Sequence, residues 1–202
     1  MAQLVSTGLG DLVPMVRSEG RHVSHAIRKL CIQLGHFEDS PLPEDKTRME
    51  LGSAFEDALA RALAERMRRS EPDRYAYIGE QCFEGVYGSP DIFDVTDHAV
   101  IEVKLTWLSI KHDPEGEKFW KYWKQLQAYC KMLDTRKGRL HIAHVNGDYS
   151  YGRGAKVCPW CKRDLKRDEV GDGPHYHVWE PDGGEFKQAE LDSNWAMIKA
   201  YS

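Results

Sequence analysis

The chain has 202 residues, of which 41% are hydrophobic and 30% are charged, and its net charge is −4. This length allows one domain with a sizeable core, and this composition is ordinary for a soluble globular protein. The charge excludes a basic field over the whole surface, so a nucleic acid would have to be held by a local groove. We expect residues 1–202 to form a single domain.

The N-terminal residues lack the basic start and the apolar run of a signal peptide. No apolar stretch approaches the ~20 residues that a membrane helix needs. The chain has five cysteines, an odd number, and three of them are scattered, namely Cys31, Cys82 and Cys130. This pattern argues against a secreted disulfide framework and predicts a protein of the reducing cytoplasm.

The first half of the chain alternates between helical and extended patterns. Its segments are, in order, a loosely packed start at 1–20, a helix at 22–34, a loop at 39–45, a long helix at about 47–68, one or two strands within 75–87, and strands at 91–95 and 99–105. Apolar residues recur at helical spacing in the helices, and β-branched and aromatic residues dominate the strands. The apolar stripe predicted for the long helix consists of Leu51, Phe55, Ala58, Leu59, Ala62 and Leu63.

The second half continues with one helix and one strand before its pattern changes. Its segments are a helix at about 117–134, a strand at 140–146, a Gly-rich and charged excursion at 147–175, a strand at 176–180 and a helix near 187–201. The buried stripe predicted for the first of these helices consists of Phe119, Tyr122, Trp123, Leu126, Cys130 and Leu133. The order helix, strands, helix, strand predicts a mixed α/β core.

Glu102 and Lys104 lie two residues apart on an apolar strand, so their side chains share one face. An exposed ion pair is the simplest interpretation of this spacing. The position of Asp91 favours a different interpretation, a metal site, because a hairpin between 91–95 and 99–105 would bring Asp91 near Glu102. Two adjacent carboxylates repel each other unless a cation lies between them, and hard oxygen ligands suit Mg²⁺ or Mn²⁺. Lys104 would then position an attacking water or balance phosphate charge beside that ion.

Four short motifs in this order resemble those of a known nuclease family. Pro90-Asp91, ten intervening residues and Glu102-Val103-Lys104 are similar to the signature of the PD-(D/E)XK nucleases. The helix before them carries Gly52-Ser53-Ala54-Phe55-Glu56, similar to the Gly-x-x-x-Glu of RecB-like members. The helix after them carries Gln125-Leu126-Gln127-Ala128-Tyr129, similar to their Gln-x-x-x-Tyr. The resemblance covers about residues 47–146. The helix at about 47–68 lacks the histidine that many RecB-like members carry there.

The resemblance implies a restriction-endonuclease-like fold, in which helices flank a mixed central sheet. In the implied site, Asp91, Glu102 and the backbone carbonyl of Val103 bind Mg²⁺ or Mn²⁺. Glu56 assists this metal site from its helix, and Lys104 positions or activates water.

On the helix at about 117–134, the resemblance implies that Gln125 supports the active site and that Tyr129 lies nearby. On a helical wheel of the helix at about 47–68, Glu56 falls at the border of the apolar stripe, between Leu63 and Met67. A solvated glutamate at that border is the plainer interpretation of Glu56, as an ordinary polar border is of Gln125.

The expected function is that of an Mg²⁺- or Mn²⁺-dependent deoxyribonuclease, in particular an exonuclease of the phage or CRISPR-associated type. It would act in DNA processing, recombination or repair in the cytoplasm of a bacterium or a phage-infected cell. The alternatives are a structure-specific or site-specific endonuclease and a nucleic-acid-binding module without activity. The intact acid–acid–lysine set favours an enzyme, because a pure binder has no physical need to keep it.

A second metal site is predicted in the excursion. The motif CPWC contains Cys158 and Cys161, and the motif HYH contains His175 and His177. Two thiolates with one or two imidazoles form a tetrahedral zinc site. We expect residues 147–177 to be a zinc-binding insertion, because the excursion has too few large apolar residues to fold alone.

Three other interpretations of the cysteine motif remain open. It could be a redox pair, although no thioredoxin-like pattern surrounds it, or a turn without metal. It could also belong to an iron–sulfur site like that of the CRISPR-associated relatives, whose ligands here would be Cys31, Cys130, Cys158 and Cys161. Against this, Cys130 lies in the middle of a predicted buried stripe, where a cysteine packs as a small apolar residue.

Cationic and aromatic residues alternate around the second long helix. Cations beside aromatic faces suit single-stranded nucleic acid or DNA ends. The residues that we expect to contact DNA are Lys111, Lys118, Tyr122 and Tyr129. A solvated helix face is the simpler interpretation for Lys121, Lys124 and Lys131.

Overall fold

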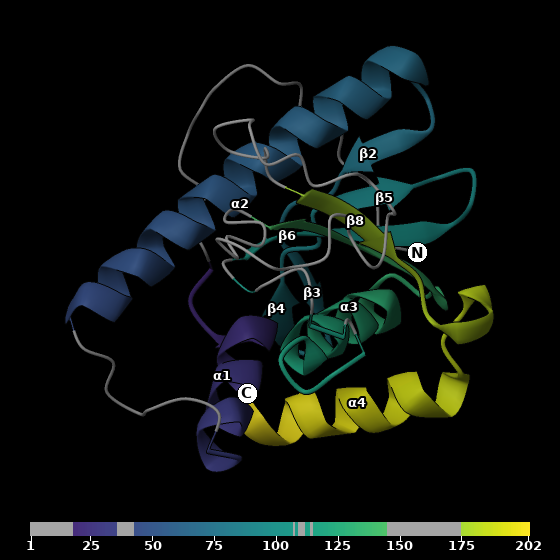
Figure 1. Cartoon of the computed structure of the whole chain (residues 1–202). Helices are drawn as coiled ribbons and strands as arrows, with labels where there is room; N and C mark the ends of the chain where they lie inside the picture. The colour runs from purple at the N-terminus through teal and green to yellow at the C-terminus, as the bar shows by residue number, and fades with distance from the viewer. Residues whose placement is uncertain (1–17, 36–42, 107, 109–111, 114, 145–174) are drawn as a thin grey trace.

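The structure is a computed structural model that describes residues 18–35, 43–106, 108, 112–113, 115–144 and 175–202, with 43–51 and 175 described by their backbone alone. In chain order the elements are β1 (Arg21–His22), α1 (Val23–Gln33), α2 (Pro43–Ser70), β2 (Tyr75–Tyr77), β3 (Gln81–Phe83), β4 (Val86–Gly88), β5 (Ile92–Asp94), β6 (Ala99–Thr106), α3 (Trp120–Met132), β7 (Lys137–His144), β8 (His175–Trp179), the 3-10 helix η1 (Asp182–Gly184) and α4 (Gln188–Tyr201) (Figure 1). The expected loose start and the expected excursion fall almost wholly outside these ranges.

A mixed five-stranded sheet, in the order β2-β5-β6-β7-β8, forms the centre of the fold. Its neighbours pair antiparallel except β6 and β7, which are parallel. A parallel pair needs a crossover connection, and α3 provides it between β6 and β7. The strands β1, β4 and β3 form a second, three-stranded sheet. The expected α/β fold, a mixed central sheet flanked by helices, is confirmed.

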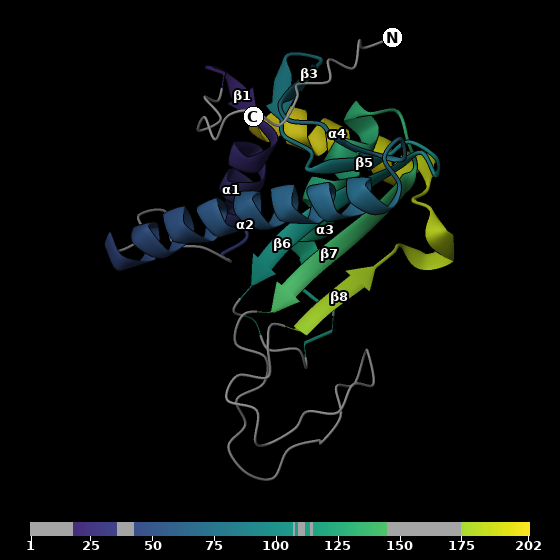
Figure 2. The same ribbon diagram turned by 90° about the horizontal axis from the view of Figure 1, so that it is seen from above.

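Helices cover both faces of the five-stranded sheet (Figures 1 and 2). On one face, Ala60 and Ala64 of α2 pack against Ile92, Ile101 and Val103 of the sheet. On the other face, α1, α3 and α4 form the larger apolar core with the remaining side chains of β5, β6 and β7. The central strand β6 is therefore buried on both faces, and seven of its eight residues are buried.

Helix α3 approaches β7 closely because β7 has a glycine at the contact. A Cβ added at Gly138 would lie 3.0 Å from the Sγ of Cys130 and 3.0 Å from the Cγ of Leu126. Cys130 is buried, and its thiol donates a hydrogen bond to the Lys137 carbonyl at 3.4 Å. The expectation that Cys130 is a packing residue is confirmed.

The buried face of α2 differs from the predicted apolar stripe. Phe55 is 56% exposed, and Ala58 and Ala62 are exposed as well. Leu59 and Leu63 of the predicted stripe are partly buried against the sheet, but the buried side chains of α2 are those of Ala60 and Ala64. The prediction followed the largest apolar residues, whereas small residues let a helix backbone lie close to a sheet.

Several boundaries also differ from those predicted. Helix α2 begins at Pro43, inside the expected loop, and it ends at Ser70, two residues before Pro72. The segment 75–87 contains three short strands in two different sheets. The two-residue strand β1 was not predicted, because so short a strand has no periodicity and depends on its pairing with β4.

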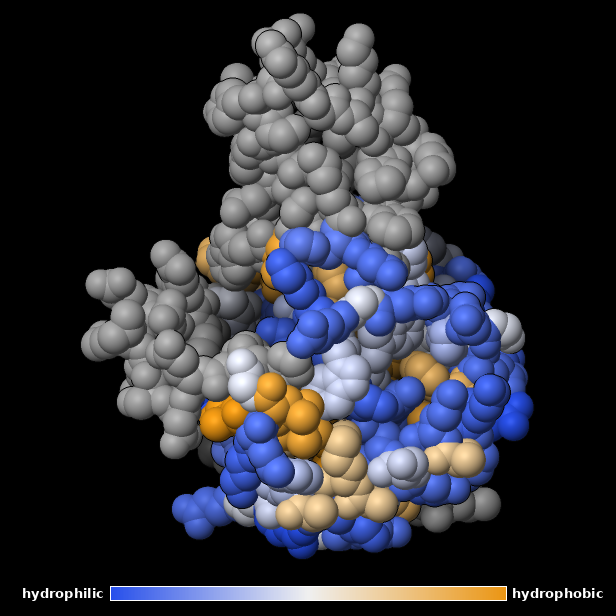
Figure 3. All heavy atoms as spheres, turned by 60° about the horizontal axis from the view of Figure 1, so that its bottom comes forward, coloured by the Kyte–Doolittle hydropathy of each residue, from blue (hydrophilic) through white to orange (hydrophobic). Residues whose placement is uncertain are grey.

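The surface of the outer helices is mainly polar. Figure 3 turns the side of α1 and α4 toward the viewer, and hydrophilic side chains cover most of the described surface there, around a smaller apolar area. None of the helices in the described ranges is both long and apolar enough to cross a membrane.

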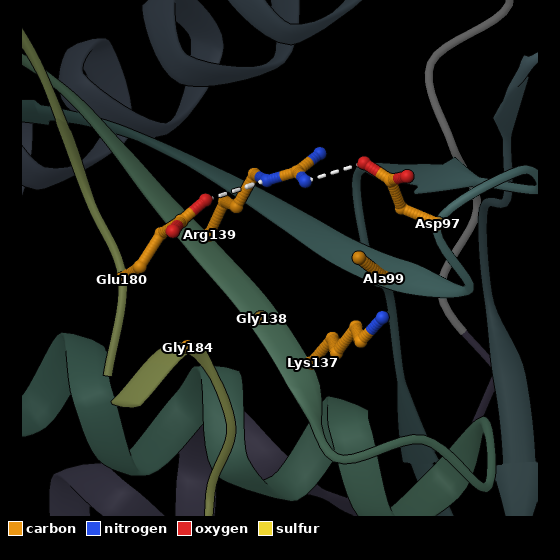
Figure 4. Close-up of a pocket in the computed structure, with 7 residues that line it drawn as sticks. All are labelled: Asp97, Ala99, Lys137, Gly138, Arg139, Glu180 and Gly184. Carbon is orange, nitrogen blue, oxygen red and sulfur yellow. Dashed lines mark hydrogen bonds and ion pairs between the residues drawn. The ribbon is translucent and has the colours of Figure 1, made fainter. Parts of the chain in front are cut away.

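Charged residues join the strands where β6 begins. The buried carboxylate of Asp94 accepts hydrogen bonds from Arg74 at 2.9 Å and from Arg139 at 2.9 Å. Arg139 also binds Asp97 and Glu180, and these three residues line a cavity of about 250 Å³ (Figure 4). The network thereby ties β5, β7 and the end of β8 together.

We predict that the Asp94 network makes the fold sensitive to acid. Burial alone would raise the pKa of Asp94, but hydrogen bonds from Arg74, the Asp97 N–H and Arg139 lower it to about 2. A lowered pKa contributes stability that is present above the unfolded-state pKa and is lost as the pH falls toward 2, here about 2 kcal/mol. Asp94→Asn should lower the free energy of unfolding at pH 7 by about 2–4 kcal/mol and should flatten its decline below pH 5.

Urea unfolding at several pH values measures both effects. The matched control is Glu185→Gln, because Glu185 pairs with Arg136 at the exposed surface, where an ion pair contributes about 1 kcal/mol or less. Equal acid sensitivity in Asp94→Asn and in the wild type would show that other carboxylates dominate.

Candidate active site

The hairpin of β5 and β6 brings Asp91 and Glu102 together. Ile92 pairs with Ile101 across the two strands, so one step further Asp91 stands opposite Glu102. The Asp91 Oδ2 accepts a hydrogen bond from the Val103 N–H at 2.8 Å. This bond holds the Asp91 carboxylate against β6, beside the Glu102 side chain.

Glu102 and Lys104 form a buried ion pair on β6. Glu102 is 1% exposed and Lys104 is 7% exposed, and the Lys104 Nζ lies 2.6 Å from the Glu102 Oε1. Both side chains lie on the face of β6 that α3 covers, because alternation along the strand puts them on the same side as Val100, which packs in the core with α3. The simpler interpretation of this pair as an exposed surface ion pair is therefore wrong.

Glu56 reaches the same pair from α2. Its Oε1 accepts a hydrogen bond from the Leu105 N–H at 3.1 Å, and its Oε2 lies 3.5 Å from the Lys104 Nζ. Helix α2 and strand β6 thus meet at the Lys104 ammonium. Glu56 is not the solvated border residue of the plainer interpretation.

The electrostatics of the cluster follow from burial and from mutual repulsion. Burial raises the pKa of Asp91 above its usual range, although Lys104 and the Val103 N–H act against this increase. Burial, and then the charge of Asp91, raise the pKa of Glu102 further. Burial alone would lower the pKa of Lys104, but the carboxylates of Glu102, Glu56 and Asp91 raise it.

The cluster has the chemistry of a site for a hard divalent cation. The buried Oε2 of Glu102 has no hydrogen-bond partner among the described residues. Within those residues no three acidic, histidine or cysteine side chains converge closely enough to hold a metal by themselves. Mg²⁺ is usually bound by one or two carboxylates, with waters and substrate phosphates completing its shell, so Asp91 and Glu102 fit that ion.

Gln125 and Tyr129 flank the cluster from α3. The Gln125 Nε2 donates a hydrogen bond to the Tyr129 Oη at 2.8 Å. Burial and the charge of Glu102 raise the pKa of Tyr129, which therefore stays a neutral phenol beside the carboxylates. Because Tyr129 is buried, the expectation that it contacts DNA is not supported, and it belongs to the wall of the site.

The other expected DNA contacts lie toward the beginning of α3 or outside the described ranges. Tyr122 is half-buried, three residues before Gln125 and therefore on nearly the same side of the helix. Lys118 is exposed just before α3, and its Nζ lies 3.1 Å from the His112 Nε2. Lys111 is outside the described residues.

The predicted zinc ligands are only partly described. Cys158 and Cys161 lie outside the described residues, and His175 is described by its backbone at the start of β8. His177 is buried in β8, on the side of the sheet that faces α3. Its ring lies next to that of His144 in β7.

Two neighbours of the site were not predicted from the sequence. Asp57 adds negative charge that raises the pKa of Asp91. Tyr77 of β2 donates a hydrogen bond to the Asp57 Oδ1 at 3.1 Å, which joins α2 to the edge of the sheet. The adjacent acids Glu56 and Asp57 were the available signal, but the partner of Asp57 depends on tertiary contacts.

We predict that Mg²⁺ stabilises the protein through Asp91. A cation that binds only the folded state adds about 2.7 kcal/mol to the free energy of unfolding at 100 times its dissociation constant. In EDTA, Asp91→Asn should be at least as stable as the wild type, because it removes one of the repelling carboxylates and keeps an acceptor for the Val103 N–H. The melting temperature of this variant should no longer rise with Mg²⁺.

Asp192→Asn is the matched control, because Asp192 lies on α4 and pairs with Lys131 at 2.7 Å. This control should keep the full Mg²⁺ response. A response that survives in Asp91→Asn would mean that the cation binds elsewhere.

Comparison with known proteins finds likeness in three dimensions only. No protein-family model and no curated protein matches the chain. A phage-related exonuclease from Haemophilus somnus 129PT is similar in structure, with a TM-score of 0.47 and 11% identity over 87% of this chain and 77% of that chain. The structure of SSO0001 is also similar, with a TM-score of 0.44 and 15% identity over 92% of this chain and 77% of that chain.

Proposed function

We propose that this protein is a metal-dependent nuclease that hydrolyses phosphodiester bonds of DNA. The observation that carries the proposal is the buried cluster in which the Lys104 ammonium lies 2.6 Å from Glu102, on the strand beside Asp91. Metal-assisted hydrolysis of a phosphodiester needs oxygen ligands for a cation and a positive side chain on the same side. The cluster supplies the carboxylates of Asp91 and Glu102 as ligands and the Lys104 ammonium as the positive group.

The energetic cost of the cluster supports an enzyme over a binding module. Each ion taken out of water costs several kcal/mol, which an ion pair recovers only in part. Here Asp91, Glu102 and Glu56 surround one lysine, so the negative charges exceed the positive charge. Arrangements of this kind are typical of functional sites, where a bound cation balances the excess.

Each residue of the cluster has a distinct task in the proposed mechanism. Asp91 and Glu102 would hold the cation, with the Val103 carbonyl as a further oxygen ligand. When bound, Mg²⁺ or Mn²⁺ polarises the phosphate and lowers the pKa of a bound water. Lys104 orients the attacking water or neutralises charge on the phosphate oxygens.

The remaining residues position these groups. Glu56 contacts both the Leu105 N–H and the Lys104 Nζ, so it fixes the lysine relative to the strand. Gln125 holds the Tyr129 hydroxyl at 2.8 Å, and this pair closes the α3 side of the site. Lys118 and Tyr122, nearer the start of α3, are proposed to contact the DNA strand.

We predict that Lys104→Gln slows DNA cleavage at least roughly 100-fold while DNA binding changes little. Glutamine is neutral but still donates a hydrogen bond to Glu102, so the buried carboxylate keeps a partner. Single-turnover cleavage assays with saturating enzyme would isolate the chemical step.

Lys131→Gln is the control, because Lys131 also lies on α3 but pairs with Asp192 of α4. It should cleave at the wild-type rate, and melting curves should show that both variants are folded. Near wild-type turnover in Lys104→Gln would reduce Lys104 to a structural ion pair.

Within the nucleases, we propose that the enzyme degrades DNA from its ends, as the RecB-like resemblance implies. With Mg²⁺ or Mn²⁺, linear DNA should disappear progressively while closed circular DNA of the same sequence stays intact. EDTA should abolish the cleavage. Nicking or linearisation of the circle would favour the endonuclease alternative, and full cleavage in EDTA would refute the metal-dependent mechanism.

A further inference from the structure

Arg61 of α2 is held in place by an acid and an aromatic ring beside the candidate active site. Its Nε donates a hydrogen bond to the Asp57 Oδ2 at 3.0 Å. Its guanidinium lies over the Tyr77 ring, with the Cζ at 5.4 Å from the ring centroid. The two contacts fix the orientation of a planar group whose side chain is otherwise flexible. None of these three residues has a task in the mechanism described above.

The Arg61 group is connected to the active-site carboxylates through β2. The Tyr77 hydroxyl donates a hydrogen bond to the Asp57 Oδ1 at 3.1 Å. The next residue of the chain, Ile78, donates its N–H to the Asp91 carbonyl at 3.3 Å. Burial raises the pKa of Asp91, and the charge of Asp57 adds to that increase. Arg61 therefore borders the site on the side of α2 and β2, which lie next to each other (Figure 1).

The plainer explanation of Arg61 is an ordinary helical ion pair. Such pairs, four residues apart, are common on surfaces and contribute little to stability. Helix α2 has a second pair of this kind, in which the Arg69 Nε lies 3.0 Å from Glu65. The Arg69 side chain is 79% exposed, whereas that of Arg61 is 23% exposed and lies on a ring. Arg61 is thus more ordered than a solvated pair requires.

The donors of Arg61 also distinguish it from the arginines that stabilise the fold. Arg74 and Arg139 each pair with three carboxylates. Among the described residues, Arg61 pairs with one carboxylate, that of Asp57, and through a single N–H. A guanidinium has five N–H donors, so the four on Nη1 and Nη2 are not used by this acid. A ligand can reach them because the side chain is partly exposed.

An arginine in this position suits a phosphate. Its planar fork binds phosphate oxygens through two parallel N–H donors. A DNA strand whose reacting phosphate lies at Asp91 and Glu102 brings its neighbouring phosphates close to the acids of α2, Glu56 and Asp57. These carboxylates would repel the strand, and a positioned cation beside them would offset that repulsion.

We propose that Arg61 binds a DNA phosphate next to the reacting one, and that Asp57 and Tyr77 position its guanidinium for this contact. The inference rests on the proposed nuclease function and adds a substrate contact on the α2 side of the site. The strand would then be held from two sides, because the contacts proposed for Lys118 and Tyr122 lie toward α3.

The salt dependence of DNA binding tests this contact, because each phosphate contact releases counterions from the DNA. Arg61→Gln should weaken the binding of a short fluorescent DNA in Ca²⁺ roughly 10-fold. It should also reduce the steepness of log affinity against log salt by about 0.7–0.9, which a purely structural role would not do. In Mg²⁺ the variant should raise KM and keep kcat within roughly 3-fold, since the contact precedes the chemical step.

Arg69→Gln is the matched control, because it removes the same kind of ion pair from the same helix. It should keep the wild-type affinity and salt dependence. Arg61→Lys retains the charge without the planar fork, so it should keep the wild-type salt dependence and bind DNA more tightly than Arg61→Gln. If Arg61→Gln does not fold, Arg61→Lys decides by itself, because it should bind DNA more weakly than Arg69→Lys.

The outcomes separate this contact from the nuclease function. Wild-type salt dependence in Arg61→Gln would overturn the contact, as would an equal loss of affinity in Arg69→Gln. A wild-type protein that binds DNA but does not cleave it in Mg²⁺ or Mn²⁺ would refute the nuclease, while the binding data would still judge Arg61. A protein that does not bind DNA would overturn both.

Discussion

The contact between Lys104 and the carboxylates around it is the constraint on which the site depends. A lysine that is 7% exposed stays charged only because Glu102, Glu56 and Asp91 surround it. The contact also joins two layers, since Glu56 comes from α2 and the other three residues come from the β5–β6 hairpin. Burial and the excess of acidic groups, three carboxylates around one lysine, raise the pKa values of Asp91 and Glu102, and a bound cation would balance that excess.

The two ends of the central strand have different tasks. Near Ala99, the buried Asp94 is fully paired with arginines, and this network fixes the strands at the start of β6. Near Lys104, about 16 Å further along an extended strand, the carboxylates outnumber their partner. The paired charges around Asp94 therefore stabilise the fold. At the Lys104 end the carboxylates repel one another, and a bound metal would relieve that repulsion.

Much of this site could be predicted from the sequence, because it depends on local rules. Alternation along a strand puts Glu102 and Lys104 on one face, and a hairpin brings Asp91 opposite Glu102. The burial of β6 was harder to predict, because it depends on strand order and on the helices that cover both faces. For that reason the sequence left an exposed ion pair as the simpler interpretation.

The errors came from features that tertiary contacts decide. The apolar stripe of α2 was drawn through Phe55, whereas the sheet is covered by Ala60 and Ala64, and this rotation moves Glu56 from a border to the packed face. Tyr129 was expected at the DNA surface but lies under the site with its hydroxyl bound to Gln125. The approach of His144 to His177 depends on the register of β7 and β8, which no local pattern encodes.

The most direct test of the central claim is to locate Mn²⁺ crystallographically in the protein bound to a short DNA. Anomalous scattering identifies manganese independently of the protein geometry. We predict one strong peak within about 2.0–2.3 Å of carboxylate oxygens of both Asp91 and Glu102, with a DNA phosphate oxygen in the same shell. Manganese bound only elsewhere, with Lys104 and Glu102 still in their ion pair and no phosphate nearby, would contradict the account.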